Sequence, residues 1–305
     1  MKILLINHYA GSPNLGMEFR PYYVTKGWVK LGHEVLIVGG SYSHLRKVQP
    51  QSCEEMIDDM RYRWVKVNPY KGNGIGRIIS MFSFVTKLYC NYRRYLRNFK
   101  PDIVIASSTY PLDIYPAYRI ARHYHAKLIY EVHDLWPLSP MELGGYSKKH
   151  PFIRIMQKAE DDCYRYADAV VSMLPKAEEH MREHGLTRDK FHYVPNGIVL
   201  SDWNNPKGIP EEHGLLLSKL RAEGKFIVGF AGAHGIANSL YAVIDAVSSL
   251  TEQNVVLVLV GGGQEKENLI KYAHKKGVTN VYFLLPINKL AIPNLLKEMD
   301  VLYIG

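Results

Sequence analysis

Short apolar runs alternate with segments of helical periodicity along nearly the whole chain. This alternation is typical of α/β proteins, in which crossover helices connect the strands of a parallel sheet. In the first part of the chain the pattern predicts strands over seven segments: residues 2–7, 34–38, 62–67, 102–106, 128–132, 169–173 and 191–194. Between most of them it predicts helices over residues 18–31, 77–98, 113–124, 152–166 and 176–184.

The pattern weakens over residues 199–224, which include Asn204-Asn205-Pro206, and then resumes. We interpret this stretch as a linker with a short helix after it. The second block predicts strands over 226–230, 255–260 and 281–285 and helices over 239–250, 266–274 and 291–299. A length of 305 residues suits two domains. We assign residues 1–198 to the first domain, 199–224 to the linker and 225–305 to the second domain.

Residues 301–305 have the composition of another buried parallel strand. A parallel sheet normally has crossover helices on both of its faces. Because no helical segment follows this strand, we expect the second domain to be incomplete.

Several protein classes do not fit the sequence. No apolar run approaches the ~18–20 residues of a membrane-spanning helix. The N-terminus lacks the cleavage site of a secretory signal, and three widely spaced cysteines, Cys53, Cys90 and Cys163, form neither a disulfide framework nor a zinc pattern. We therefore expect a cytoplasmic protein.

The positive charge is concentrated in one segment. The formal net charge is +9, and residues 61–101 hold ten lysines and arginines and no acidic residue. Within this segment the apolar residues Ile78, Phe82, Val85, Leu88, Tyr89, Tyr92, Leu96 and Phe99 follow the spacing of an amphipathic helix. The basic helix, residues 77–100, either packs on the core with a solvated charged back or also contacts anionic lipid headgroups or a phosphate-bearing substrate. We expect no nucleic-acid binding, because the segment matches none of the known nucleic-acid-binding signatures.

Glycine-rich turns follow three of the predicted strands, at residues 11–16, 229–235 and 261–263. Ligands of open α/β sheets bind at the carboxyl ends of the strands. Glycines there either let the backbone approach a pyrophosphate or only form tight turns. No turn continues into Gly-Lys-Ser/Thr, which excludes a P-loop nucleotidase. The first turn is not GxGxxG, which disfavours an NAD-dependent oxidoreductase.

A polar cluster, Glu131-Val132-His133-Asp134, follows the predicted strand 128–132. His133 is either a structural histidine or a group that exchanges a proton or hydrogen bond with a hydroxyl, with a carboxylate fixing its tautomer. We find no His, Cys, Asp or Glu grouping with metal-ligand spacing.

Taken in order, several segments resemble the retaining glycosyltransferases of family 4, which have the GT-B fold of two facing Rossmann-like domains. The polar cluster further resembles a WbuB-like branch that works on bacterial surface polysaccharides. The resemblance covers nearly the whole chain and rests on 13–16 with Arg20, 31–35, 100–104, 131–137, 194–198, Gly232, 261–263 and 280–284.

The resemblance implies a site in a cleft between the two domains, with His133 beside the reacting sugar as the catalytic residue. On the acceptor or phosphate side it implies Arg20, Asp134 and Asn196. No metal and no cofactor are implied, since the nucleotide-sugar, which we expect to be UDP-linked, is a substrate. The residues that it implies for donor binding are Gly16, Gly232, His234, Gly262, Gly263, Leu285 and Pro286.

Two features depart from the family pattern. Many members carry Arg and Lys, which bind the diphosphate, where this chain has Ala233 and Asn238. We therefore expect backbone N–H groups, His234 or Arg20 to supply the balancing interactions. The family's paired glutamates, expected shortly after Gly305, are also absent from this chain.

The leading hypothesis is a glycosyltransferase of O-antigen or capsule type biosynthesis, in truncated form. Its acceptor would be polyprenyl-diphosphate-linked or a polysaccharide, and the enzyme would be peripheral at the inner face of the cell membrane. A nucleotide-sugar epimerase of the same fold and a non-catalytic, shortened binding protein remain as alternatives.

Overall fold

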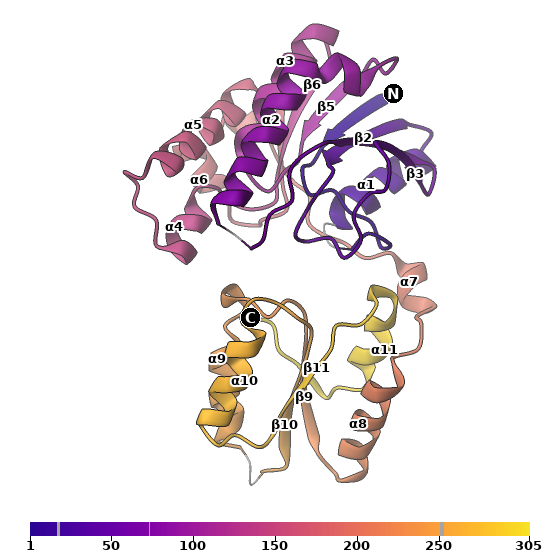
Figure 1. Cartoon of the computed structure of the whole chain (residues 1–305), viewed down its shortest axis with the longest axis vertical. Coiled ribbons are helices and arrows are strands. Elements are labelled where there is room, and N and C mark those ends of the chain that lie inside the picture. The colour runs from indigo at the N-terminus through magenta and orange to yellow at the C-terminus, as the bar shows by residue number, and fades with distance from the viewer. Residues whose placement is uncertain (17–18, 73, 251–252) are drawn as a thin grey trace. The chain divides into compact units, whose positions relative to one another are not determined.

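The computed structural model describes residues 1–16, 19–72, 74–250 and 253–305. The chain forms two compact units, Met1–Asn196 and Gly197–Gly305 (Figure 1). The division falls two residues before the end that we assign to the first domain.

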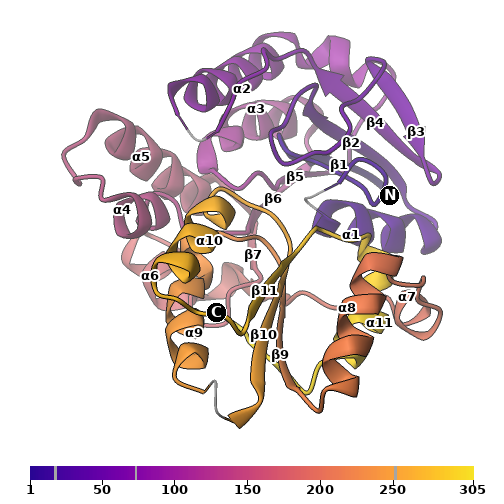
Figure 2. The same cartoon turned by 60° about the horizontal axis from the view of Figure 1, so that its bottom comes forward.

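The first unit is built on an eight-stranded sheet in the order β3-β4-β2-β1-β5-β6-β7-β8. All neighbours are parallel except β3 and β4, and Figure 2 shows β1, β2, β4 and β3 side by side. The sequence analysis missed β3, because it is a short, acidic edge strand without an apolar run. The strands are β1 Lys2–Ile6, β2 Glu34–Gly40, β3 Glu54–Ile57, β4 Met60–Val65, β5 Ile103–Ala106, β6 Lys127–Val132, β7 Ala169–Ser172 and β8 Phe191–Tyr193.

Helices cover both faces of this sheet. Buried side chains of α2, α3, α5 and α6 share one core with alternate strand residues, whereas α1 packs on the opposite face. Residue 18, the predicted start of the first helix, lies outside the described residues. The helices are α1 Phe19–Lys30, α2 Ile75–Leu96, α3 Ile114–Tyr124, α4 Leu138–Gly144, α5 Pro151–Tyr166 and α6 Glu178–Glu183, with 3-10 turns at Pro111–Asp113 and Arg188–Lys190.

Helix α2 is amphipathic, as predicted, but its core face differs from the expected one. Val85, Leu88, Tyr92 and Leu96 are buried, whereas Phe82 and Tyr89, which we expected on the core face, are exposed. Phe82 shares its exposure with Ile75 and Ile79, seven and three residues earlier. The helix therefore carries an apolar stripe on its outer surface as well as its buried face.

The second unit contains a four-stranded parallel sheet in the order β11-β10-β9-β12. Helices α8 and α11 pack on one face, and α9 and α10 on the other (Figure 1). Its elements are α7 Leu200–Asn204, α8 Glu211–Ala222, β9 Phe226–Ala231, α9 Leu240–Ser248, β10 Val255–Val260, α10 Lys266–Lys275, β11 Val281–Leu284, α11 Ile292–Lys297 and β12 Val301–Leu302, with 3-10 turns at Ile236–Asn238 and Lys289–Ala291.

Residues 199–224 belong to the second unit. They form α7 and α8, and Leu217 and Leu220 of α8 are buried in its core. The short helix that we expected after the linker is thus a core helix of the second unit. Strand β12 pairs in parallel with β9 as predicted, but Val301 and Leu302 are 47% and 44% exposed rather than buried.

Candidate functional site

In the first unit, polar side chains meet where β5 and β6 end. The Ser107 hydroxyl donates to Glu131 Oε2 over 2.6 Å and lies 3.0 Å from His133 Nε2. His133 Nε2 is also 3.3 Å from Glu131 Oε2. These three residues form a network, which we call the β6-edge network, and Glu131 is the carboxylate that directs His133.

Glu131 is ionised within this network. Burial by itself would raise the pKa of its carboxyl. The hydrogen bonds from His133 and Ser107, with the charges of His133 and Arg20, outweigh burial and lower that pKa to about 2. The carboxylate therefore keeps a negative charge beside His133 over the physiological pH range.

Arg20, from α1, connects the β6-edge network to the last residues of the first unit. Its Nε donates to Glu131 Oε1 over 3.0 Å, and the two side chains are largely buried. Its terminal nitrogens donate to the carbonyls of Val194 and Pro195 and to Asn196 Oδ1, over 3.0–3.1 Å. The structure thus brings together three predicted site residues, Arg20, His133 and Asn196, and the Arg20 charge is paired with Glu131.

Two other residues of this edge lie outside the network. Asp134 accepts a hydrogen bond from the Ser139 hydroxyl of α4. His8, at the end of β1, is fully buried, and its ring stacks on Phe84 at 4.6 Å. Burial, with the charges of Arg46 and Arg77, lowers the pKa of His8 well below its usual value, so this histidine is a neutral core residue.

Gly16 lies in a loop that a buried arginine holds in place. The backbone at Gly16 has φ +102°, and a Cβ there would lie 3.0 Å from the backbone nitrogen of Lys47. The adjacent Arg46 donates to the carbonyls of Ala10 and Gly40 over 2.7 and 2.9 Å. The glycine is therefore required by the packing of two loops at the carboxyl edge of the sheet.

In the second unit, the turns after β9 and β10 are in direct backbone contact. A Cβ on Gly261 would lie 1.9 Å from the carbonyl oxygen of Gly232, and one on Gly263 would lie 2.4 Å from that of His234. His234 N donates to the Gly262 carbonyl over 2.8 Å. We call these two segments, residues 232–235 and 261–263, the paired glycine turns. Their glycines serve turn-to-turn packing whether or not a ligand is bound.

His234 is buried within the paired glycine turns. Neither ring nitrogen has a hydrogen-bond partner in the described part of the chain. Burial, together with the charge of Lys266, lowers the pKa of His234 to about 4. The ring of His234 is therefore neutral near pH 7, and a balancing interaction from it would be a hydrogen bond rather than a charge.

A cation at this edge that the sequence analysis did not single out is Lys266. Its Nζ donates to the carbonyls of Gly261 and Leu284 over 2.8 and 2.7 Å. Burial lowers the pKa of this amine. Lys266 thus connects the end of β11 to the paired glycine turns. Its position at the start of α10, directly after a glycine turn, is the sequence signal that could have identified it.

Leu285 and Pro286 follow β11, and both are exposed. The carbonyl of Leu285 lies 2.9 Å from Nε2 of His213, a buried residue of α8. Since a carbonyl only accepts, His213 must donate through Nε2. His213, also missed from the sequence, thus holds a segment that the resemblance assigns to donor binding.

Each unit is a doubly wound α/β domain with polar groups or glycine turns at the carboxyl edge of its sheet, which is the architecture of the GT-B fold. Residues 16–197 match the glycosyl transferase 4-like domain, and residues 217–304 match the glycosyl transferases group 1 domain. The chain belongs to the glycosyl transferase 4-like family and is an enzyme of that class. Among curated protein sequences, none matches it.

Solved structures with the same fold share little sequence with this chain. Anabaena HepE, in complex with UDP and glucose, is 19% identical with a TM-score of 0.67; the match covers 99% of this chain and 73% of HepE. WaaG, a glycosyltransferase involved in lipopolysaccharide biosynthesis, is 17% identical with a TM-score of 0.66; the match covers 99% of this chain and 74% of WaaG. Sucrose-phosphate synthase from Thermosynechococcus elongatus is 14% identical with a TM-score of 0.74; the match covers 99% of this chain and 74% of the synthase.

None of the helices among the described residues has the length and hydropathy needed to span a bilayer.

Proposed function

We propose that this enzyme transfers a sugar, with retention of configuration and without a metal, from a UDP-linked donor to a polyprenyl-diphosphate-linked or polysaccharide acceptor of bacterial surface polysaccharide biosynthesis. The observation that carries the proposal is the row of paired glycine turns and the Leu285–Pro286 segment along one sheet edge of the second unit. HepE, with the same fold, was solved with UDP and glucose, which supports a nucleotide-sugar donor.

The donor would bind at the edge of the second unit. Gly232, Gly262 and Gly263 offer backbone close to the diphosphate, where N–H groups can stabilise the charge that grows on the leaving group. His234, being neutral, would act through a hydrogen bond rather than a charge. The Leu285–Pro286 backbone would contact the base.

The acceptor would meet the β6-edge network of the first unit. Glu131, ionised and held by Ser107 and Arg20, fixes the orientation of His133. A neutral or protonated imidazole so held can hydrogen-bond the sugar hydroxyls beside the reacting carbon. Arg20, Asp134 and Asn196 would shape the surroundings of this site, and the loop at Gly16 would face the donor diphosphate.

Donor binding provides the first test. We expect calorimetry to detect binding of UDP to the chain, with ADP and GDP bound at least about tenfold more weakly, a difference of about 1.4 kcal/mol. If no nucleoside diphosphate binds, the proposed donor site is wrong.

Turnover provides the second test. With UDP-sugars and a bacterial lipid extract, His133→Ala should reduce UDP release by about 100-fold or more while leaving UDP affinity unchanged. His274→Ala, an exposed residue of α10, is the matched control and should behave as wild type. A new sugar epimer formed without any acceptor would instead favour an epimerase.

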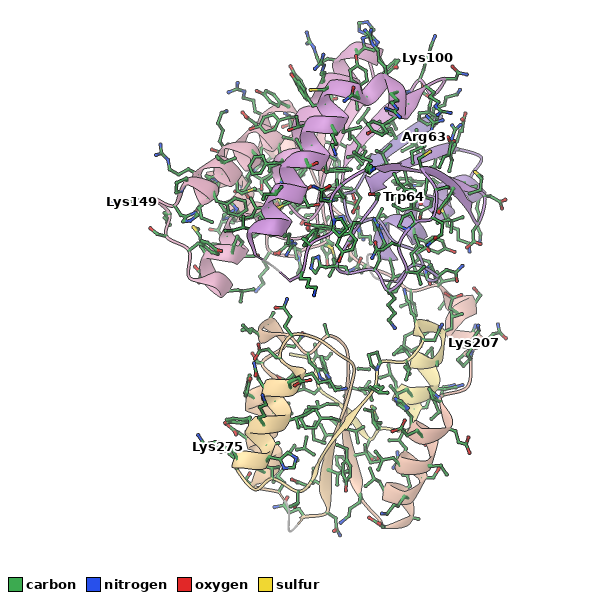
Figure 3. All side chains as sticks on the ribbon, in the orientation of Figure 1. Arg63, Trp64, Lys100, Lys149, Lys207 and Lys275 are labelled. Carbon is green, nitrogen blue, oxygen red and sulfur yellow. The ribbon has the colours of Figure 1, made fainter. Side chains whose placement is uncertain are left out.

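Helix α2 supports a peripheral membrane location. Ile75 and Ile79 are 76% and 57% exposed on the outer stripe, and the exposed Arg93 and Arg94 lie near its other end. Lys100, which follows the helix, also extends from the fold (Figure 3). Exposed apolar side chains and cations on one helix suit the interface of an anionic bilayer.

Vesicle sedimentation tests this location. The chain should bind vesicles containing phosphatidylglycerol and not pure phosphatidylcholine. At about 1 kcal/mol per basic residue, Arg93→Gln combined with Arg94→Gln should weaken binding by roughly tenfold or more. Lys271→Gln with Lys275→Gln on α10 removes equal charge elsewhere and should have little effect. Equal losses in both variants would mean that binding is non-specific.

A further inference from the structure

A second group of polar side chains lies between α5 and α6, and none of its members belongs to the β6-edge network. Glu160 comes from α5, and His180 and His184 come from α6 and the residue after it. One ligand atom from each of the three residues lies within 4.8 Å of those of the other two. The sequence analysis missed the group, because the carboxylate is far from the histidines along the chain.

The carboxylate of Glu160 is buried, being 1% exposed. It accepts hydrogen bonds from the Tyr164 hydroxyl and from Gln157 Nε2, both over 2.8 Å. His180 Nε2 lies 3.1 Å from Glu160 Oε1, and this is the single ion-pair contact of Glu160 within the described residues. No lysine or arginine of those residues therefore neutralises this buried charge.

Gln157 packs against the same group of side chains. Its Nε2 lies 2.8–2.9 Å from Glu160 Oε2, Asp161 Oδ1 and His184 Nδ1. A side-chain amide has two N–H groups, so it donates to at most two of these atoms. His184 Nδ1 is also 3.1 Å from Asp161 Oδ1 and donates there in the tautomer that carries the proton on Nδ1. Among the described residues, Nε2 of His184 is then the ring nitrogen with a free lone pair.

We propose that Glu160, His180 and His184 form a binding site for a transition-metal ion of the Zn²⁺ class. Two imidazoles and one carboxylate are a common ligand set for this ion, with water as the fourth ligand. The 3.1 Å contact between Glu160 and His180 is close to the ligand separation of roughly 3.4 Å in a tetrahedral site. Rotation of the His184 ring would bring the third nitrogen into place, and Asp161 would hydrogen-bond that imidazole. The ion would fasten α6 to α5.

The test is a calorimetric titration of ZnCl2 into the untagged, chelator-treated chain. We expect one high-affinity ion per chain and a rise of several degrees in Tm on metal addition. His180→Ala and His184→Ala should each weaken binding by about 100-fold. His274→Ala removes an exposed helical histidine elsewhere and should leave the affinity unchanged.

A further variant separates loss of the metal from loss of the fold. Glu160→Gln keeps an acceptor for Tyr164 and should retain native circular dichroism while losing tight metal binding. The proposal is overturned if the wild-type chain binds Zn²⁺ no better than the His180→Ala, His184→Ala double variant. It is also overturned if all variants bind equally, since the ion would then be held elsewhere.

Discussion

The two units present different chemistry at the carboxyl edges of their sheets. In the first unit, side chains at the ends of β5 and β6 form the β6-edge network, which Arg20 of α1 contacts through an ion pair with Glu131. In the second unit, the paired glycine turns bring backbone against backbone, and Lys266 and His213 hold carbonyl groups. A side-chain site is destroyed by removing a group, whereas a backbone site is destroyed by adding one. The predictions below test this contrast, in order of expected effect.

Removing a charge should have the largest effect in the first unit. Glu131→Gln leaves the buried Arg20 guanidinium without its carboxylate, which should lower the free energy of unfolding by about 3–5 kcal/mol. Urea denaturation measures this loss. Adding Arg20→Gln to this variant should recover part of the stability, since no buried charge is then unpaired. A double variant less stable than Glu131→Gln would contradict this interpretation.

The same pair predicts a dependence on acid pH. The pKa of Glu131 is lowered from 4.5 to about 2, so its contribution to stability is complete above pH 4.5 and is lost as the pH falls toward 2. The Glu131→Gln variant should lack this part of the acid-induced loss.

In the second unit, adding one methyl group should be the damaging change. Gly261→Ala places a Cβ 1.9 Å from the Gly232 carbonyl oxygen at φ +155°, so the paired glycine turns must separate. We expect UDP affinity to fall by about 100-fold, equivalent to about 2.7 kcal/mol. Gly208→Ala, at a position with open space around it, is the control for calorimetry and should bind UDP as wild type. Unchanged affinity in Gly261→Ala would show that the turn contact does not shape the donor site.

A buried acid should make the first unit sensitive to neutral pH. Asp113 is fully buried and accepts from the backbone nitrogen of Ser108 over 2.9 Å. Burial outweighs the hydrogen bonds from Ser108 and raises its pKa from 3.8 to about 7. Because the folded state binds this proton more tightly, the contribution of Asp113 to the free energy of unfolding falls as the pH rises from about 4 through 7.

Asp113→Asn should remove this dependence. Between pH 5 and 8 the wild-type chain should lose about 2–3 kcal/mol more unfolding free energy than the variant. Urea titrations at the two pH values measure the difference, and parallel curves would show that Asp113 is ionised throughout.

The smallest effect should come from His213. His213→Phe removes the donor to Leu285 and should weaken UDP binding by about fivefold, the equivalent of one hydrogen bond of about 1 kcal/mol. His213→Gln keeps an N–H donor and should restore part of the affinity. If the Phe and Gln variants bind UDP equally, the hydrogen bond from His213 does not position the Leu285–Pro286 segment.

The sequence predicted most of the fold because buried parallel strands carry strong apolar runs. Val255–Val260, for example, consists only of valine and leucine and was predicted to the residue. The elements that it missed lack this signal. Strand β3, for example, is short and acidic. Tertiary contacts decide such elements, and local sequence does not show them.

The candidate site could be predicted from the sequence where its residues lie at the end of a predicted strand. Glu131 and His133 could be placed together because they lie next to each other along the chain. Arg20, by contrast, was expected to balance a ligand's charge, but its ion pair with Glu131 joins residues 111 positions apart. His234 has no local signal for its burial, so its neutral ring could not be predicted. Protonation depends on surroundings that a one-dimensional pattern does not contain.

The contact between the paired glycine turns also bears on the entropy of ligand binding. Because Gly261 and Gly263 abut the backbone of Gly232 and His234, neither turn can move without displacing the other. Both would then be ordered when the second unit folds, before any ligand arrives. A diphosphate bound at this edge would encounter a preorganised surface, and little of its binding energy would be consumed in ordering the loops.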